Sequence, residues 1–213
     1  RVKTLHPKVA GGILARRGNQ KDLEEAKKAG FSLIDFVIVN LYPFEATIRK
    51  EGVSEAEAVE QIDIGGPTLI RAAAKNFESV TVVTEPHQYA QIMREIELHE
   101  RPSLELRREL ALAAFERTSA YDKAISDWFR CRLGKPELLD LHYEKVRSLR
   151  YGENPHQKAA FFRNPENHDP NVTNARVLHG KELSFNNIVD ANSALELVKE
   201  FAHPAVAFIK HNN

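Results

Sequence analysis

A carboxylate, a pair of glycines and a lysine follow one another between Asp63 and Lys75. Asp63 stands just before Gly65 and Gly66, and the proline after them is typical of the first turn of a helix. The backbone amides of such a turn, together with the helix dipole, favour a negative charge. Asp63 is therefore a candidate functional residue, although a double glycine alone is too common to establish more.

Lys75 is expected to close the helix that these glycines open. The rise of a helix separates Lys75 from the start of the helix by about 14 Å, so Asp63 and Lys75 are not automatically a pair. The two side chains could flank a substrate, or Lys75 could only cap the last carbonyls of its helix. The spacing leaves both interpretations open.

Two further segments concentrate polar side chains. Arg1, Lys3 and Thr4 offer two cations and a hydroxyl, which suit an anion, although most such clusters are solvated surface. The segment 150–157 (RYGENPHQ) carries a guanidinium, a phenol, a carboxylate, two amides and an imidazole on a loop shaped by glycine and proline. A stable loop needs the glycine and proline but not all of these hydrogen-bonding groups, so this segment is a candidate ligand-binding loop, and a loop with a structural role alone is the alternative.

Several classes of function are disfavoured by composition. Thirty basic and thirty acidic side chains leave no net field toward nucleic acid or an anionic membrane. No stretch reaches the roughly 18 apolar residues of a membrane span. The histidines show no metal-ligand spacing, and no P-loop or dinucleotide fingerprint is present, so no metal is expected. The single cysteine, Cys131, fits a reducing cytoplasm.

Buried strands alternate with helices in the first half. The apolar runs 33–42 and 79–84 are typical of strands of a parallel sheet buried on both faces. Between them, a capping box at Ser54–Glu57 predicts the start of one helix, and the glycine pair predicts another. The sequence therefore predicts an α/β domain, with ligands beyond the carboxyl ends of strands, near Tyr42.

A long helix is predicted over Ser103–Leu133, with one apolar face that indicates core packing. That face comprises Leu110, Ala114, Tyr121, Ile125 and Trp128. The pattern breaks over 134–146, and we place a domain boundary there, dividing the chain into domains 1–141 and 142–213.

The second domain is expected to contain a loop over 164–174, a helix that Asp190 caps and that extends to Phe201, and a buried strand over 205–209. Lys210 and His211 would then follow the carboxyl end of a strand. The chain opens without methionine and stops just after the predicted strand, so we expect a piece of a longer protein.

Taken together, these segments resemble one family, and the matches come in the family's order. RVKTLHPKVAGGIL, NLYPF, EQIDIGGPTLIRAAAKN and SAYDKAISDWF resemble the inosine monophosphate cyclohydrolase domain of the bifunctional purine-biosynthesis enzymes. LRYGENPHQ and FIKHNN resemble the start of their aminoimidazole carboxamide ribonucleotide (AICAR) transformylase domain. The family's glycine- and serine-rich phosphate loops and most of its second domain are missing.

The resemblance implies a parallel-sheet, methylglyoxal-synthase-like domain that lacks its N-terminal part, followed by the start of an α/β, cytidine-deaminase-like transformylase domain. It implies the last two steps of inosine monophosphate synthesis, formyl transfer and dehydrative ring closure. Small ribonucleotides and the co-substrate 10-formyltetrahydrofolate would be bound, and ring closure would need no cofactor. A cytoplasmic homodimer without nucleic-acid or membrane partners is implied as well.

For ring closure, the resemblance makes Asp63 the candidate base that takes the amide proton. It makes Lys3, Tyr42 and Lys75 candidates to polarise the formyl oxygen or to move protons. Substrate contacts are implied for Arg1, Thr4, Gly65 and Gly66.

For formyl transfer, His211 matches the family's catalytic histidine, with Lys210 beside it. Arg150 and Tyr151 match the segment that holds the ribonucleotide, and Asn187 and Asp190 lie near that segment. The folate-binding part of the family lies beyond Asn213.

Two rival functions remain open. The first domain resembles a fold that elsewhere senses ligands, so a non-catalytic nucleotide- or effector-binding domain is conceivable. The combination of Lys3, Asp63 and Lys75 argues against it, because binding alone needs no placed base. A purely structural or interaction role is the other rival.

Overall fold

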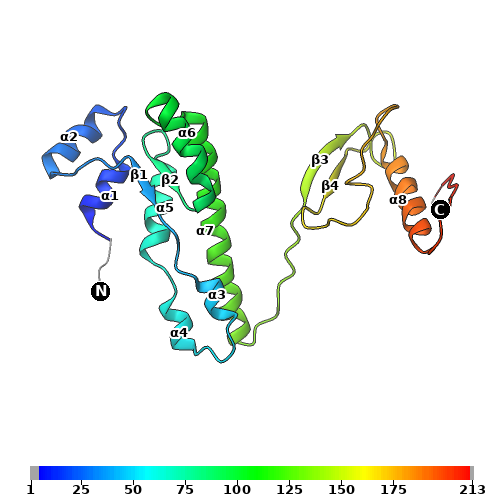
Figure 1. The fold of residues 1–213 in the computed structure, drawn as a ribbon, viewed down its shortest axis with the longest axis horizontal. Coiled ribbons are helices and arrows are strands. Elements are labelled where there is room, and N and C mark those ends of the chain that lie inside the picture. Colours follow the sequence, from blue (N-terminus) through cyan, green and yellow to red (C-terminus); the bar gives the residue numbers. More distant parts are fainter. Residues whose placement is uncertain (1–4, 212–213) are drawn as a thin grey trace. The chain divides into compact units, whose positions relative to one another are not determined.

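The computed structural model describes residues 5–211, which form two compact units that divide between Glu137 and Leu138. The helices and strands of the first unit are α1 (Pro7–Leu14), α2 (Gln20–Ala29), β1 (Phe36–Ile38), α3 (Phe44–Ile48), α4 (Glu55–Glu60), α5 (Gly65–Lys75), β2 (Thr81–Val83), the short 3-10 helix η1 (Pro86–Gln88), α6 (Tyr89–His99) and α7 (Leu104–Arg132) (Figure 1).

The two strands of the first unit are parallel, with Val37 opposite Val82. Every residue of β2 is buried, as predicted. The α/β class with a parallel sheet is thereby confirmed.

The prediction of a long strand buried on both faces is wrong for β1. Only three residues of the apolar run pair, and only Val37 is buried, whereas Phe36 and Ile38 are 38% and 57% exposed. Val37 packs into the main core, while Phe36 and Ile38 line an apolar groove that α6 borders. Among the described residues β1 pairs with β2 alone, and α6 covers the face that carries Phe36 and Ile38 only in part.

The predicted helix starts are confirmed. Ser54 and Glu57 form the capping box of α4, and α5 begins at the glycine pair and ends at Lys75. Ser103 caps α7, which is one helix of 29 residues. Its predicted apolar face packs inward, with Tyr121 completely buried.

Two clusters of buried side chains form the core of this unit. The larger one joins α5, β2 and α7, with Ile70, Val82 and Leu110 among its members. The smaller one surrounds Phe44 and Tyr121, with Trp128 packed against it. Helix α7 contributes to both clusters and therefore connects the sheet to the segments at the start of α3 and α5.

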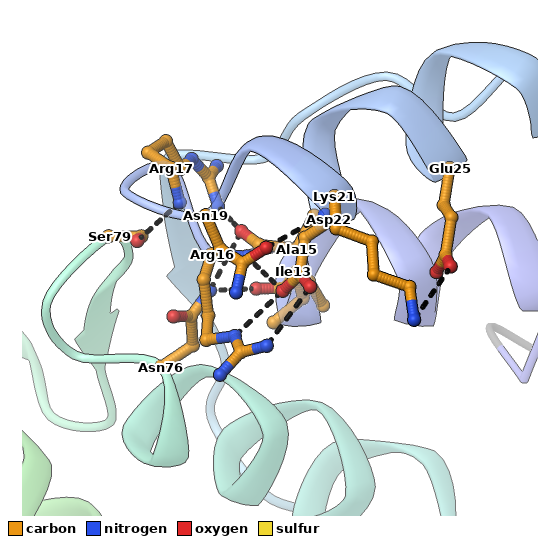
Figure 2. A network of polar contacts seen from close by, with 10 residues as sticks. All are labelled: Ile13, Ala15, Arg16, Arg17, Asn19, Lys21, Asp22, Glu25, Asn76 and Ser79. Atoms are coloured by element: carbon orange, nitrogen blue, oxygen red, sulfur yellow. Dashed lines mark hydrogen bonds and ion pairs between the residues drawn. The ribbon is translucent and has the colours of Figure 1, made fainter.

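Polar contacts fasten the end of α5 to the end of α1 (Figure 2). The buried amide of Asn76 donates to the carbonyls of Ile13 at 2.7 Å and Ala15 at 3.1 Å. The Arg17 backbone N–H donates to Ser79 Oγ at 3.1 Å. Because Asn76 directly follows Lys75, this network fixes the carboxyl end of α5.

The second unit contains β3 (Glu144–Leu149), β4 (Ala159–Arg163) and α8 (Phe185–Lys199). Strands β3 and β4 are antiparallel, with an irregularity between Lys145 and Arg147. The segment 164–174 forms turns without a helix or strand, as predicted.

Two predictions for the second unit are wrong. Ser184, not Asp190, caps α8, because Ser184 and Asn187 form a capping box that starts the helix earlier, and the helix ends at Lys199. The segment 205–209 forms no strand, and Val206 and Phe208 are 81% and 97% exposed. A strand needs a neighbour for its backbone groups, and no described strand pairs with this segment.

Replacing Asn76 by alanine is expected to lower the free energy of unfolding by about 1–3 kcal/mol, because two carbonyls lose a buried donor. Chemical denaturation of the first unit would measure this loss. Gln91→Ala, at an exposed position of α6 in the same unit, is the matched control and should change stability by less than about 0.5 kcal/mol. Equal stability of both variants would contradict the role of Asn76.

Candidate active site

The segment after β1 and the turn before α5 meet through Asp63. The Tyr42 backbone N–H points to Asp63 Oδ2 at 3.4 Å, and the Gly66 N–H donates to Asp63 Oδ1 at 2.8 Å. Tyr42 itself is 53% exposed, so its side chain is accessible beside the turn. The structure therefore brings three of the predicted residues together: Tyr42, Asp63 and Gly66.

Asp63 also caps α5. Ile64, at the formal capping position, makes no side-chain cap bond, and the Asp63 carboxylate satisfies the Gly66 amide instead. Asp63 therefore has a structural role at the start of α5. This role leaves the carboxylate able to accept further hydrogen bonds, because each of its oxygens accepts one bond from the backbone and has a second lone pair.

The close approach at Gly66 explains the glycine. A Cβ at this position would lie 2.5 Å from Asp63 Oδ2 and 2.8 Å from Leu41 Cδ2. Only glycine lets the first turn of α5 pass this close to the carboxylate and to the segment that leads to Tyr42.

Lys75 is the last residue of α5, and the rise of the helix places it about 15 Å from the first residue, Gly65. It lines a cavity of about 700 Å³ between α5 and α7, together with Leu14, Ala72, Ala74, Ala111, Leu112 and the residues discussed next. In this cavity the Arg71 guanidinium lies 5.4 Å from the Phe115 ring centre, and that of Arg108 lies 5.7 Å from the Phe77 ring centre. The structure therefore does not join Lys75 to Asp63.

Arg1, Lys3 and Thr4 lie outside the described residues. The chain enters α1 at Pro7, where His6 caps the helix by accepting the Lys8 N–H on Nδ1 at 3.1 Å.

In the second unit, the loop 150–157 is stabilised by its own polar groups. Gly152 N–H donates to the Gln157 carbonyl at 2.8 Å, and Asn154 N–H donates to Gln157 Oε1 at 2.9 Å. The Arg150 guanidinium lies 4.9 Å from the centre of the Tyr151 ring, and its Nη2 donates to the phenol oxygen at 3.3 Å. Arg150 and Tyr151 thus form one cationic and aromatic surface.

His211 and Asp190 lie near each other, with Nδ1 and Oδ2 4.0 Å apart. Lys210 is exposed. The Asn187 side chain takes part in the capping box of α8, where its Oδ1 accepts from Ser184 Oγ at 2.9 Å. Of the predicted residues in this unit, His211 and Asp190 therefore lie close together, whereas the Asn187 amide bonds within the capping box of α8.

One residue next to the first site is predicted from the sequence only as core. Tyr121 Oη accepts the Asp63 N–H at 2.9 Å and donates to the Gln61 carbonyl at 2.9 Å. Burial raises the pKa of this phenol, and the nearby Asp63 and Glu45 charges act in the same direction, so the hydroxyl keeps its proton. The helical spacing of Tyr121 indicates burial but gives no signal for this contact.

Among residues 5–211, no group of three or more histidine, cysteine or carboxylate side chains is arranged to hold a metal. None of the described helices combines the length and apolarity needed to cross a membrane.

Gly66→Ala should lower the free energy of unfolding by about 1–3 kcal/mol, because the new methyl group must displace Asp63 or Leu41. Thermal or chemical unfolding would measure it. Gly18→Ala is the control, since a Cβ at Gly18 meets nothing within 4 Å. A Gly66→Ala variant as stable as Gly18→Ala would mean that the turn adapts without cost.

Comparison with known proteins places the chain in a family. A family model described as "AICARFT/IMPCHase bienzyme" matches residues 73–213, and one described as "MGS-like domain" matches residues 11–68. Similar curated proteins include the "Bifunctional purine biosynthesis protein PurH" of Acetivibrio thermocellus, which is 50% identical, and that of Oceanobacillus iheyensis, which is 48% identical. Both alignments cover 100% of this chain and 42% of the relative, so the chain spans about two fifths of its relatives' length.

A solved structure titled "Crystal structure of ForH" is also similar, with a TM-score of 0.54 and 36% identity over 60% of this chain and 66% of that chain. The two family matches follow each other in the order that the sequence motifs predict. The resemblance and the methylglyoxal-synthase-like fold of the first part are thereby confirmed. The chain belongs to the AICARFT/IMPCHase bienzyme family.

Proposed function

We propose that this chain is part of an enzyme that performs the last two steps of inosine monophosphate synthesis, with ring closure in domain 1–141 and the start of the formyl-transfer domain in 142–213. The observation that carries the proposal is the arrangement at Asp63 in a member of this family. A partly exposed carboxylate is held beside Tyr42 and the amides that open α5. This arrangement suits proton removal next to a developing negative charge.

In ring closure, the carboxamide nitrogen attacks the formyl carbon of the same molecule, and water is then lost. Binding aligns two groups that already belong to one substrate, so no cofactor is required. Asp63 takes the amide proton, and Tyr42 and Lys3 polarise the formyl oxygen. Following the family resemblance, Arg1, Thr4 and the Gly65 amide hold the nucleotide. The N–H of Gly66 is bonded to Asp63 Oδ1, so Gly66 contributes to the site by the close approach that its missing Cβ allows.

Lys75 enters this proposal differently. It lies a helix length from Asp63, so it can act only on a substrate that extends along α5, or from the cavity beside α7. The Lys75 ammonium and the neighbouring Arg71 and Arg108 suit an anionic part of such a substrate.

In formyl transfer, the amine of AICAR attacks the formyl carbon of 10-formyltetrahydrofolate, and the folate nitrogen leaves with a proton. His211 accepts the proton of the amine, and Asp190 stabilises the imidazolium that forms. Lys210 stabilises the oxyanion, and Arg150 with Tyr151 holds the ribonucleotide. We further propose that the whole protein is a cytoplasmic homodimer.

Asp63→Asn in the full-length protein is expected to slow ring closure by about 10²- to 10⁴-fold, the usual value of a positioned base. The asparagine oxygen can still accept the Gly66 N–H, so the cap and the fold should persist. Formyl transfer should be nearly unchanged. Asp122→Asn, at an exposed position of α7, is the matched control and should affect neither step.

His211→Ala should give the opposite result, with formyl transfer lost and ring closure kept, and His203→Ala serves as its exposed control. Each activity is measured separately by spectrophotometry, together with the melting temperature. Equal loss of both activities in either variant at unchanged stability would mean that the sites are not independent. Loss of both with a lowered melting temperature in Asp63→Asn would favour the purely structural role.

Ring closure by the full-length protein should also be unchanged by a strong chelator, because every proposed role falls to a side chain or a backbone amide. A large chelator-dependent loss of rate would contradict this. The rival effector-binding function is tested by thermal-shift scanning with phosphate alone and with the formylated ribonucleotide.

A further inference from the structure

The two segments that form the first candidate site share one attachment point on α7. The turn Gln61–Asp63 is attached through its backbone, and the segment after Tyr42 is attached through Phe44. In both cases the partner is Tyr121, which is completely buried. The ring of Tyr121 contacts Phe44 edge-on with 6.2 Å between ring centres.

The hydroxyl of Tyr121 holds the turn from both sides of Ile62. It accepts the N–H of Asp63 and donates to the carbonyl of Gln61, each at 2.9 Å. Two bonds to the backbone fix the orientation of the peptide units around the turn, and therefore the direction in which the Asp63 carboxylate leaves the chain. A neutral phenol can serve as donor and acceptor together, and burial raises its pKa, which favours this neutral form further.

Arg117 reinforces this attachment one turn earlier on α7. Its Nη1 donates to Glu45 Oε1 at 2.8 Å, and its guanidinium lies 5.5 Å from the centre of the Tyr121 ring. Glu45 lies in α3, directly after Phe44. The segment that carries Tyr42 is thus held by an ion pair as well as by the aromatic contact.

We propose that Tyr121 is a positioning residue for ring closure: it sets the Asp63 carboxylate against Tyr42 by holding the two segments on one side chain. The proposal rests on the proposed function, in which Asp63 is the base. Tyr121 touches no substrate and acts through the turn. Its hydroxyl is not needed to fill the core, because a phenylalanine would fill the same space.

Tyr121→Phe in the full-length protein separates position from packing. The ring and its contact with Phe44 remain, while both bonds to the turn are lost. We expect kcat of ring closure to fall by about 10- to 100-fold, since a small misplacement of a catalytic group is this costly, with KM changed less than about threefold. Formyl transfer should be unchanged, and the Asp63 amide should exchange with solvent faster.

Two control variants exclude general effects. Val82→Ala, in the fully buried strand β2, should lower stability at least as much as Tyr121→Phe but leave kcat within about twofold. Tyr89→Phe removes a phenol from an exposed position of α6 and should change nothing. If Val82→Ala reduces kcat as much as Tyr121→Phe, the effect is one of stability, and the positioning role is overturned.

The outcomes also separate this proposal from the function on which it rests. If Asp63→Asn slows ring closure and Tyr121→Phe does not, Tyr121 is only a core residue. If neither variant slows ring closure, Asp63 is not the base. In that case unchanged exchange of the Asp63 amide in Tyr121→Phe would show, independently of activity, that the turn does not depend on the hydroxyl.

Discussion

The packing of α7 along α5 and β2 is the contact on which the rest of the first unit depends. Small side chains on the two helices, such as Ala73 and Ala114, let them approach closely, and Ile70 and Leu110 fill the space toward the sheet. Burial of this apolar surface is the main favourable term in the folding of such a domain. It also fixes the position of α7 along its axis and its rotation about that axis, and therefore the place of the buried Tyr121 side chain.

Helix α5 has two chemically different ends because different partners hold them. Its first turn is bound by a carboxylate and, through the preceding turn, by a buried phenol, so the amides and Asp63 share one small region. Its last turn is bound by the amide of Asn76 to the end of α1, and the Lys75 side chain lines the cavity beside α7. A rigid helix cannot bring these ends together, so Asp63 and Lys75 can act in one reaction only by contacting different parts of the same substrate.

In the second unit, too, the groups that order the backbone differ from the candidate ligand-binding groups. Gln157 bonds to two backbone amides of the loop 150–157, so the loop is ordered without using Arg150 or Tyr151. Their guanidinium and phenol therefore remain available for a ligand. On α8, by contrast, the Asn187 amide is committed to the capping box, and Asp190, farther along the helix, is the residue that approaches His211.

By itself, the sequence determined the parallel α/β class, the capping box of α4, the limits of α5 and the length of α7. These features depend on local spacing: apolar periodicity, a capping side chain, or a glycine pair before a helix. The order of the motifs also identified the family, because each motif is long and its residue types are unusual together.

Only the tertiary structure decided which side chains meet. Asp63 and Tyr42 lie 21 residues apart along the chain, and Tyr121 lies 58 residues beyond Asp63, yet all three join at one turn. The wrong prediction of a strand over 205–209 has the same reason. An apolar run indicates that a segment is favoured to be buried, but a strand forms only where a neighbouring strand supplies hydrogen bonds. Local pattern fixes what an element is, whereas contacts between distant segments fix where its side chains act, because these contacts depend on how every other element packs.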